Sequence, residues 1–203
     1  MITIATVLWA PNAKSQPFST VYTERWAEKL YRNFAKHLTR PFRFVVFTDR
    51  PRTFAEPGIE QAALTAEVPD YGCCIEPFAL GVPSIIVGLD TVVTGNIDHL
   101  VEYCLNEKAL ALPRSPGKEF ACNGVALVPA GHRHVFDNWR GENDMEWLRR
   151  QPHVFIDDLW PGQVNSYKCH IRPMGLGDTR IAYFHGPPKM DSLNEPWIQT
   201  NWR

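Results

Sequence analysis

The chain lacks an excess of charge of either sign. Its 21 Lys and Arg residues are balanced by 22 Asp and Glu residues, and the formal net charge is −1. Because binding to a nucleic-acid backbone needs clustered Lys and Arg, this balance gives no support to nonspecific nucleic-acid binding. A local basic groove is still compatible with it, and its candidate residues are Arg25, Lys29, Arg32 and Arg43.

The chain also lacks the cysteine spacings of a disulfide framework or a zinc site. Its five cysteines are an odd number without a repeating interval, so we expect free thiols and a cytoplasmic location, where thiols stay reduced. The adjacent Cys73 and Cys74, even together with Cys169 and His170, contain no Cys-x-x-Cys pair and do not predict zinc. Buried free thiols explain them better.

Long apolar runs are missing too. The N-terminal apolar stretch follows no basic segment and is too short for a signal peptide or a membrane span, so we expect neither. With 203 residues and 44% apolar content, the chain fits one globular domain over residues 1–203. Its 17 prolines and seven tryptophans predict ordered loops around a sheet and aromatic surfaces that stack on a flat ligand.

Apolar patterning predicts an α/β fold. Strands are expected at Ile4–Ala10 and Phe42–Phe47, and apolar side chains recur every fourth residue from Tyr22 to Leu38, as on one face of a helix. A strand, helix and strand with short links predict a right-handed parallel pair. No period is visible over residues 51–82. Further strands are expected at 85–87, 110–112, 122–128, 154–158 and 180–184, and short helices at 97–105, 132–139 and 143–150.

The stretch Pro83–Asp98 is central to this organisation. Its apolar run Ile85–Val87 is typical of a strand buried on both faces, and Asp90 follows where that strand ends. Open α/β sheets bind ligands beyond the carboxyl ends of their strands, so Asp90 is the leading candidate for the functional centre. The alternative is that Asp90 caps a turn. Asp49, at the end of the preceding strand, either hydrogen-bonds a nucleotide or closes a turn.

The segment after the last expected strand is the second informative stretch. It contains His185, Gly186 and, after two prolines, Lys189. An imidazole suits Mn²⁺ or Zn²⁺, a lysine suits a phosphate, and the glycine permits close approach of the backbone. Because this strand is expected to end at the same edge as Asp90, the three residues indicate a nucleotide-diphosphate site. The alternative is a neutral histidine in a turn and a solvated lysine.

Two further polar residues have both structural and functional explanations. Asn123 precedes Gly124, and Asn-Gly is strong turn chemistry in itself. Asp144 is expected in the first turn of a helix capped by Asn143, where a carboxylate interacts favourably with the helix dipole. Neither residue is assigned to a site on these patterns alone.

Several motifs, taken in order, support a resemblance that covers nearly the whole chain. The segments that match are Phe47–Asp49, Leu89–Asp98, Asn123–Val125, Asp144, Trp160–Lys168 and Phe184–Lys189. With these motifs the chain resembles glycosyltransferases of the GT-A fold, close to family 8, and more narrowly the small bacterial and phage proteins of that type. The resemblance implies a single, Rossmann-like nucleotide-diphospho-sugar transferase domain with a mixed, mostly parallel central sheet.

The resemblance also implies a reaction, which is transfer of a sugar from a nucleotide sugar, usually a UDP-sugar, to an acceptor. A divalent cation and a lysine would neutralise the charge that grows on the leaving diphosphate. By resemblance, Asp90 and His185 hold Mn²⁺ or Mg²⁺, and Lys189 with Gly186 binds the diphosphate. Asn123 and Asp144 match catalytic positions that face the donor sugar or acceptor, and Asp49 lies near the nucleotide pocket. The acceptor is a glycan, a protein or a small molecule; DNA is an alternative without support from the net charge.

The chain departs from the family pattern at several positions. Gly88 stands where the family has the first Asp of its Asp-x-Asp motif, and Met145 stands where it has the glutamine of a Gly-Asp-Gln-like motif. The family also has a lysine in the segment before the central strand, and the corresponding place here is near Glu76. The metal-binding histidine of family 8 stands three residues before the glycine, where this chain has Tyr183, whereas His185 directly precedes Gly186; this departure weakens the metal role of His185. These departures leave open a second hypothesis, in which a degenerate GT-A domain binds a nucleotide sugar or glycan, or is structural, without turnover.

Overall fold

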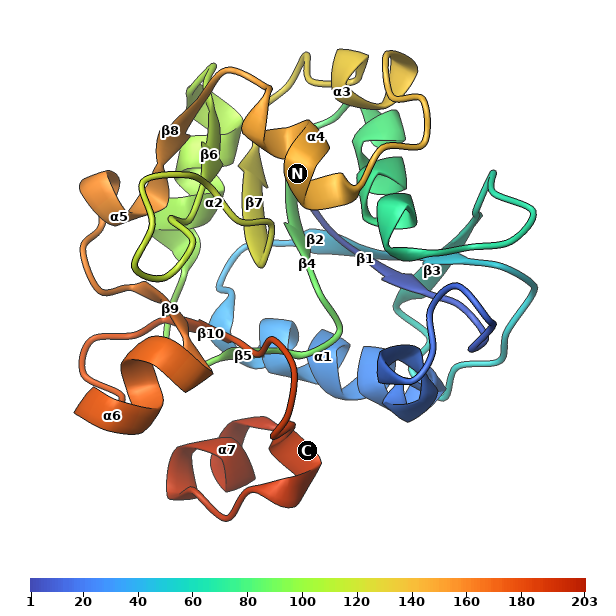
Figure 1. Ribbon diagram of the computed structural model, residues 1–203. Coiled ribbons are helices and arrows are strands. Elements are labelled where there is room, and N and C mark those ends of the chain that lie inside the picture. Colours follow the sequence, from blue (N-terminus) through green and yellow to red (C-terminus); the bar gives the residue numbers. More distant parts are fainter.

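A seven-stranded, mostly parallel sheet forms the centre of the computed structural model, which describes residues 1–203 (Figure 1). All strands except β7 run in one direction, and β7 is antiparallel to both of its neighbours, β4 and β6. The fold is therefore the predicted α/β class with a mixed, mostly parallel sheet. In spatial order the strands are β3 (Ile59–Ala63), β2 (Phe42–Thr48), β1 (Ile2–Leu8), β4 (Ser84–Val87), β7 (Val125–Val128), β6 (Leu110–Leu112) and β8 (His153–Phe155).

The first strand–helix–strand unit has the predicted form. Helix α1 (Glu24–His37) connects β1 to β2, and the two strands pair in parallel from Ile2 beside Phe42 to Leu8 beside Thr48. Its residues Trp26, Leu30 and Phe34 are buried, which confirms the apolar stripe. Tyr22 lies outside the helix, because α1 begins only after Thr23.

The two faces of the central sheet have different covers. Ile85 and Val87 belong to a core that includes residues of α1 and α2 (Asp98–Asn106), whereas Ile86 packs with residues of η2, α3 and α4 on the other face. In Figure 1, α3 and α4 accordingly lie at the opposite side of the sheet from α1. Three consecutive apolar residues, Ile85–Val87, are what burial on both faces requires. The bounds of the second cover are η2 (Tyr71–Leu80), α3 (His134–Asp137) and α4 (Asp144–Arg149).

A separate three-stranded sheet joins the segment after Asp90 to the C-terminal part of the chain. Its strands are β5 (Thr91–Val93), β10 (Ile181–Tyr183) and β9 (Val164–Ser166), with β5 antiparallel to β10. The expectation that Arg180–Phe184 ends at the edge of the central sheet was therefore wrong. Tyr183 pairs with Thr91 instead, because β10 finds its hydrogen-bond partners in β5 and β9.

Two other segments differ from the sequence patterns. Residues 51–82, which show no period, contain β3 and the 3₁₀ helix η2, and a 3₁₀ helix with an internal proline has no 3.6-residue period to detect. The strand expected over 154–158 ends at Phe155, where the chain turns into α5 (Ile156–Leu159). No helix in the structure has the length and apolar character that crossing a membrane requires.

The end of the chain packs back onto α1. Asp191 forms an ion pair with Lys29 at 2.7 Å, and the Asn201 side chain contacts His37 at 2.8 Å. The rings of Trp26 and Trp202 meet edge to face, with 5.3 Å between their centroids. The remaining short helices are η1 (Phe18–Val21), η3 (Tyr167–Ile171), α6 (Arg172–Met174), η4 (Met190–Ser192) and α7 (Pro196–Asn201).

Candidate active site

A cleft of about 620 Å³ opens at the edge of the central sheet where β1 and β4 end and β7 begins. Because β7 is antiparallel to β4, Val125 pairs with Val87, and the residues before β7 lie beside those after β4. The cleft therefore lies beyond the carboxyl ends of the parallel strands, where α/β folds bind ligands. Its volume falls within the range of small-molecule sites, about 300–1,000 Å³.

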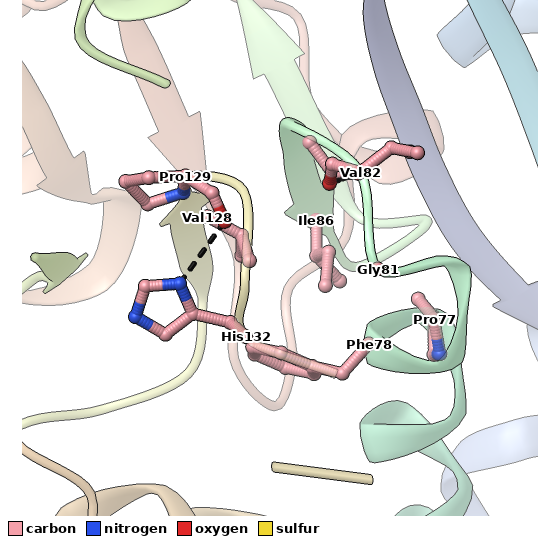
Figure 2. Close-up of a pocket in the computed structure, with 9 residues that line it drawn as sticks. Pro77, Phe78, Gly81, Val82, Ile86, Val128, Pro129 and His132 are labelled. Atoms are coloured by element: carbon pink, nitrogen blue, oxygen red, sulfur yellow. Dashed lines mark hydrogen bonds between the residues drawn. The ribbon is translucent and has the colours of Figure 1, made fainter. Parts of the chain in front are cut away.

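A second hollow, between η2 and the segment after β7, is much smaller than this cleft (Figure 2). It is lined by Phe78, Ile86, Val128 and His132, and it contains no space for even a water-sized ligand. The His132 ring is held there by its Nδ1, which lies 3.0 Å from the carbonyl oxygen of Pro129. The large cleft is therefore the candidate site.

Asp90 enters the cleft from the junction of the two sheets. It follows Gly88 and Leu89 after β4 and directly precedes β5, and its carbonyl oxygen accepts a hydrogen bond from the Phe184 N–H at 2.9 Å. The antiparallel pairing of β5 with β10 thus brings the residues after Tyr183 to Asp90. The convergence of Asp90, His185 and Lys189 on one cleft was expected, and the structure brings all three there.

Asp90 is at the centre of a network of charged and polar groups. Its Oδ2 accepts hydrogen bonds from the Lys189 ammonium and from the Tyr22 hydroxyl, the latter at 2.7 Å. The side chains of Asp90 and Lys189 are only 17% and 16% exposed, so the pair is shielded from bulk water. Burial and, after it, the Asp90 charge raise the pKa of Tyr22, which keeps its hydroxyl protonated as a donor.

His185 and Gly186 form the adjoining part of the rim. His185 Nε2 lies 2.8 Å from Ser166 Oγ and 3.8 Å from Cys169 Sγ. Burial, followed by the positive charges of Lys168 and Lys189, lowers the pKa of His185, so the ring is neutral near pH 7. Gly186 has φ +64°, a left-handed conformation that favours glycine, and it turns the chain from His185 toward Lys189.

Asn123 and Asp144 meet across the cleft from two different elements. The Asn123 amide donates to Asp144 Oδ2, while Asn143 caps α4 as predicted by accepting from the Glu146 N–H at 3.3 Å. Asp144 is buried, and burial raises its pKa although the Asn123 hydrogen bond opposes this shift. No cation forms an ion pair with Asp144, so its hydrogen-bond partners, the Asn123 amide and the backbone N–H groups of Asp144 and Met145, are all neutral.

The glycine of the Asn123–Gly124 pair is explained by packing rather than by turn chemistry. Gly124 has no positive φ, and a Cβ on it would lie 2.6 Å from the ring of Tyr183. The ring therefore occupies the space of a side chain, and glycine is required for this close approach. Tyr183 also accepts a weak hydrogen bond from Cys122 Sγ at 3.6 Å.

Asp49 does not line the cleft. Its Oδ1 accepts from Arg52 at 2.7 Å and its Oδ2 from the Ala10 N–H at 3.1 Å. Burial raises the pKa of Asp49, but the hydrogen bonds from Arg52 and Ala10 outweigh burial and leave the pKa below its ordinary value. Both oxygens are engaged in local structure, so the contacts favour the alternative in which Asp49 closes a turn.

Sequence patterns missed several cleft residues at the end of β1. The rings of Trp9 and Tyr71 lie edge to face at 5.8 Å, and Trp9 Nε1 and Thr6 Oγ1 are buried without a hydrogen-bond partner.

Arg149, on α4, stacks on Phe120 at 4.2 Å and donates from Nε to the Ala121 carbonyl, while its Nη groups bond no protein acceptor. Abundant tryptophan was the only sequence signal for the aromatic end of the cleft.

Solved structures of glycosyltransferases share this architecture. The glycosyltransferase GlyE of Streptococcus pneumoniae TIGR4 superposes with a TM-score of 0.63 and 13% identity, covering 98% of this chain and 59% of GlyE. The bifunctional WbbM gives a TM-score of 0.59 and 9% identity over 93% of this chain and 46% of that protein. The chain therefore spans little more than half of GlyE and less than half of WbbM. The chain has a GT-A-like fold.

The galactosyltransferase LgtC, solved with donor and acceptor sugar analogues, is similar over most of its own length. It has a TM-score of 0.56 and 9% identity, covering 93% of this chain and 88% of LgtC. No protein-family model and no curated protein matches the sequence. At these identities the likeness concerns the fold alone.

The donor set of the cleft does not fit the divalent metal that the GT-A resemblance implies. No group of three or more His, Cys, Asp or Glu side chains in residues 1–203 is arranged to hold a metal ion. Gly88 contributes no carboxylate, and Oδ2 of Asp90 is already bonded to Lys189 and Tyr22. At the Asp90 end of the cleft, one carboxylate and one neutral imidazole are a small set for Mn²⁺ or Mg²⁺, both of which prefer several oxygen ligands.

The basic residues considered for nucleic-acid binding are mostly neutralised. Lys29 pairs with Asp191 at 2.7 Å, Arg32 with Glu56 at 2.7 Å, and Arg43 with Glu60 at 2.5 Å. Of the four candidates only Arg25 has no ion pair. A groove that neutralises phosphates needs unpaired cations, so these contacts give a DNA acceptor no support.

Proposed function

We propose that this protein is a glycosyltransferase of the family 8 type, which transfers a sugar from a nucleotide sugar to an acceptor. A UDP-sugar is the expected donor, and a glycan, a protein or a small molecule is the acceptor. The observation that carries the proposal is the cleft itself, because it collects Asp90, Lys189, His185, Asn123 and Asp144 at one edge of a GT-A-like fold.

The aromatic end of the cleft suits the nucleoside. Trp9 and Tyr71 present apolar ring surface beside two unpartnered polar atoms, Trp9 Nε1 and Thr6 Oγ1. A heterocyclic base offers a flat face that stacks on aromatic rings, and the two buried polar atoms show that this end of the cleft is not fully satisfied by the protein itself. We therefore place the base at this end in the proposal.

The charged part of the cleft suits the diphosphate. Lys189 and Arg149 both line it, and the left-handed turn at Gly186 positions the segment between His185 and Lys189. During transfer the bond from the sugar's anomeric carbon to the diphosphate oxygen breaks, and negative charge grows on that oxygen. Cations fixed at this place stabilise the transition state more than the ground state.

Asn123 and Asp144 are then the residues at the sugar. Both carry polar atoms into the cleft and each fixes the other through their mutual hydrogen bond. Because burial raises its pKa, Asp144 is a stronger proton acceptor than an exposed carboxylate. The proposal gives it the task of accepting a hydrogen bond from a hydroxyl of the donor sugar or of the acceptor.

The proposal is tested by nucleotide release. The purified protein is incubated with UDP-, GDP- and ADP-sugars, with and without Mn²⁺ and a mixture of acceptor glycans, and free nucleoside diphosphate is measured. Release from at least one donor that Asp144→Asn abolishes supports the proposal. The matched control is Lys108→Ala, an exposed site at the end of α2 with no ion pair, which retains wild-type release.

A second function, binding without turnover, is favoured by two positions. Gly88 replaces one acidic residue of the family motif, and Met145 places a thioether in the cleft where the family has an amide. In this alternative a nucleotide sugar binds and stays intact. Calorimetric binding of a donor, together with no release above the buffer rate over the whole panel, would establish it.

A further inference from the structure

We infer that the Lys189 ammonium, held by Asp90, takes the place of the divalent cation in this cleft, so that nucleotide diphosphates bind without metal. The inference rests on the proposed function and goes beyond it, because it assigns the cation. Asp90 becomes a positioning residue for Lys189 rather than a metal ligand.

The first observation is what surrounds Asp90. Its Oδ1 is so close to Gly88 that a Cβ at residue 88 would lie 2.7 Å from it. The space that a second acidic side chain would need is therefore partly filled by Asp90 itself. A carboxylate pair for a cation and the observed position of Asp90 exclude each other unless Asp90 rotates.

The second observation is that a cation already occupies the carboxylate. Lys189 Nζ bonds Asp90 Oδ2, and Tyr22 donates to the same oxygen. A divalent ion at Asp90 would have to displace Lys189, whose side chain is 16% exposed, and leave its ammonium without a partner. Separating a shielded ion pair is costly, because the freed charge keeps its desolvation penalty.

The third observation is the fixed position of Lys189. The ammonium is held by Asp90 Oδ2, by the Phe184 carbonyl oxygen at 3.4 Å and by the face of the Tyr22 ring at 5.7 Å. An ammonium has three N–H donors, and two protein acceptors leave one of them for a ligand. Arg149 lines the same cleft with its Nη groups unbonded, so positive charge that no carboxylate neutralises is also present.

In the reaction, this arrangement needs no proton transfer at the diphosphate. As the bond between the anomeric carbon and the diphosphate oxygen breaks, its electron pair stays on that oxygen. The free N–H of Lys189 donates a hydrogen bond to the diphosphate and remains an ammonium. The anomeric carbon forms its new bond to the acceptor oxygen, whose proton passes to the Asp144 carboxylate, the proton acceptor of the proposed function.

The test measures binding and does not depend on turnover. UDP and inorganic pyrophosphate are titrated into the full-length protein in EDTA and again in excess Mn²⁺ or Mg²⁺. Binding is followed by calorimetry and by tryptophan fluorescence, since Trp9 lines the cleft. We expect the dissociation constants with and without metal to agree within about threefold, a difference below 1 kcal/mol.

Two variants identify the cation. Lys189→Ala weakens UDP binding by about 10- to 100-fold in EDTA and in Mn²⁺ alike, as loss of a charge-assisted hydrogen bond predicts. Asp90→Asn weakens it by a similar factor in both buffers, since Lys189 loses its anchor. Lys108→Ala is the control, and circular dichroism with a thermal melt establishes that each variant is folded. If the Lys189→Ala protein is unfolded, the Lys189→Met variant, which keeps an apolar side chain of similar length, is measured in its place.

The outcomes separate the inference from the proposed function. UDP that binds at least tenfold more tightly with Mn²⁺, or an Asp90→Asn loss seen only with Mn²⁺, overturns the inference and leaves glycosyl transfer standing. A wild-type protein that binds neither UDP nor pyrophosphate under any condition overturns both. Metal-independent binding that is lost in Lys189→Ala supports both.

Discussion

Two carboxylates face the same cleft from different surroundings. Asp90 shares its Oδ2 with an ammonium and a phenol, whereas Asp144 has an amide as its side-chain partner. Asp90 therefore belongs to a neutralised pair, and Asp144 carries a buried charge without a counterion. A paired carboxylate is suited to fix the position of its partner, while an unpaired one keeps a perturbed pKa that chemistry can use.

The largest effect that tests this contrast is expected at the unpaired carboxylate. Asp144→Asn keeps an acceptor oxygen for Asn123 but removes the charge, so we expect donor turnover to fall by about 10²- to 10⁴-fold. UDP affinity changes little, because Lys189 has Asp90 and not Asp144 as its ion-pair partner. Steady-state release and calorimetry measure the two. A variant with wild-type turnover would remove Asp144 from the catalytic group.

The next effect concerns the paired carboxylate. Gly88→Asp forces Asp90 from its position, because the new Cβ would lie 2.7 Å from Asp90 Oδ1. We expect metal-free UDP affinity to fall about tenfold as Lys189 loses its partner, and Mn²⁺ to restore part of it through the new carboxylate pair. Gly88→Ala adds the same Cβ without a charge, so it is the control for the rescue: it loses metal-free affinity likewise, and Mn²⁺ does not restore it. A Gly88→Asp protein that binds like the wild type in EDTA would contradict the role given to Asp90.

A stability measurement sharpens the contrast at the level of folding. Burial raises the folded-state pKa of Asp144, so the wild type loses stability as pH rises from the ordinary carboxyl pKa through the raised one. Asp144→Asn removes this cost, and we expect its free energy of unfolding near neutral pH to exceed that of the wild type by about 0.5–2 kcal/mol. The difference disappears below the ordinary carboxyl pKa, where Asp144 is protonated in both states. Urea denaturation over a pH series measures it, and a less stable Asn variant at neutral pH would refute it.

The smallest effect is expected at the phenol. Tyr22→Phe removes one donor to Asp90 while the ring under Lys189 remains, so UDP affinity falls by about two- to fivefold. The measurement is the calorimetric titration in EDTA. Tyr31→Phe, on α1 and away from the cleft, is the control. A loss as large as that of Lys189→Ala would mean that Tyr22 contacts the ligand itself.

Local patterns were sufficient for the elements that position the cleft. The β1–α1–β2 unit, the buried strand β4 and the acidic residue after it all follow from short apolar periods and their ends. The convergence of Asp90 with Lys189 was also predicted, but for the wrong reason. It results from the pairing of Thr91 with Tyr183, and nothing periodic in either three-residue strand indicates its partner.

Other features depend on contacts between distant residues and had no local signal. Tyr22 was assigned to a helical stripe, yet its hydroxyl lies 2.7 Å from Asp90, which is 68 positions away. Gly124 was explained by a turn, but its missing side chain leaves room for the Tyr183 ring. The 3₁₀ helix η2, with Pro77 inside it, has no 3.6-residue repeat by which it could be found.

The packing of the C-terminal residues on α1 has a consequence for Lys189. Before this lysine, the chain is fixed by β10, and the Lys189 ammonium bonds the Phe184 carbonyl oxygen that follows this strand. After it, Asp191 forms an ion pair with Lys29. Asn201 and Trp202 add contacts to His37 and Trp26 of α1. Shortening the chain after Lys189 would leave every residue of the cleft in the sequence yet release one end of the segment that presents the ammonium. We therefore expect truncation after Lys189 to weaken ligand binding, although the removed residues lie outside the cleft.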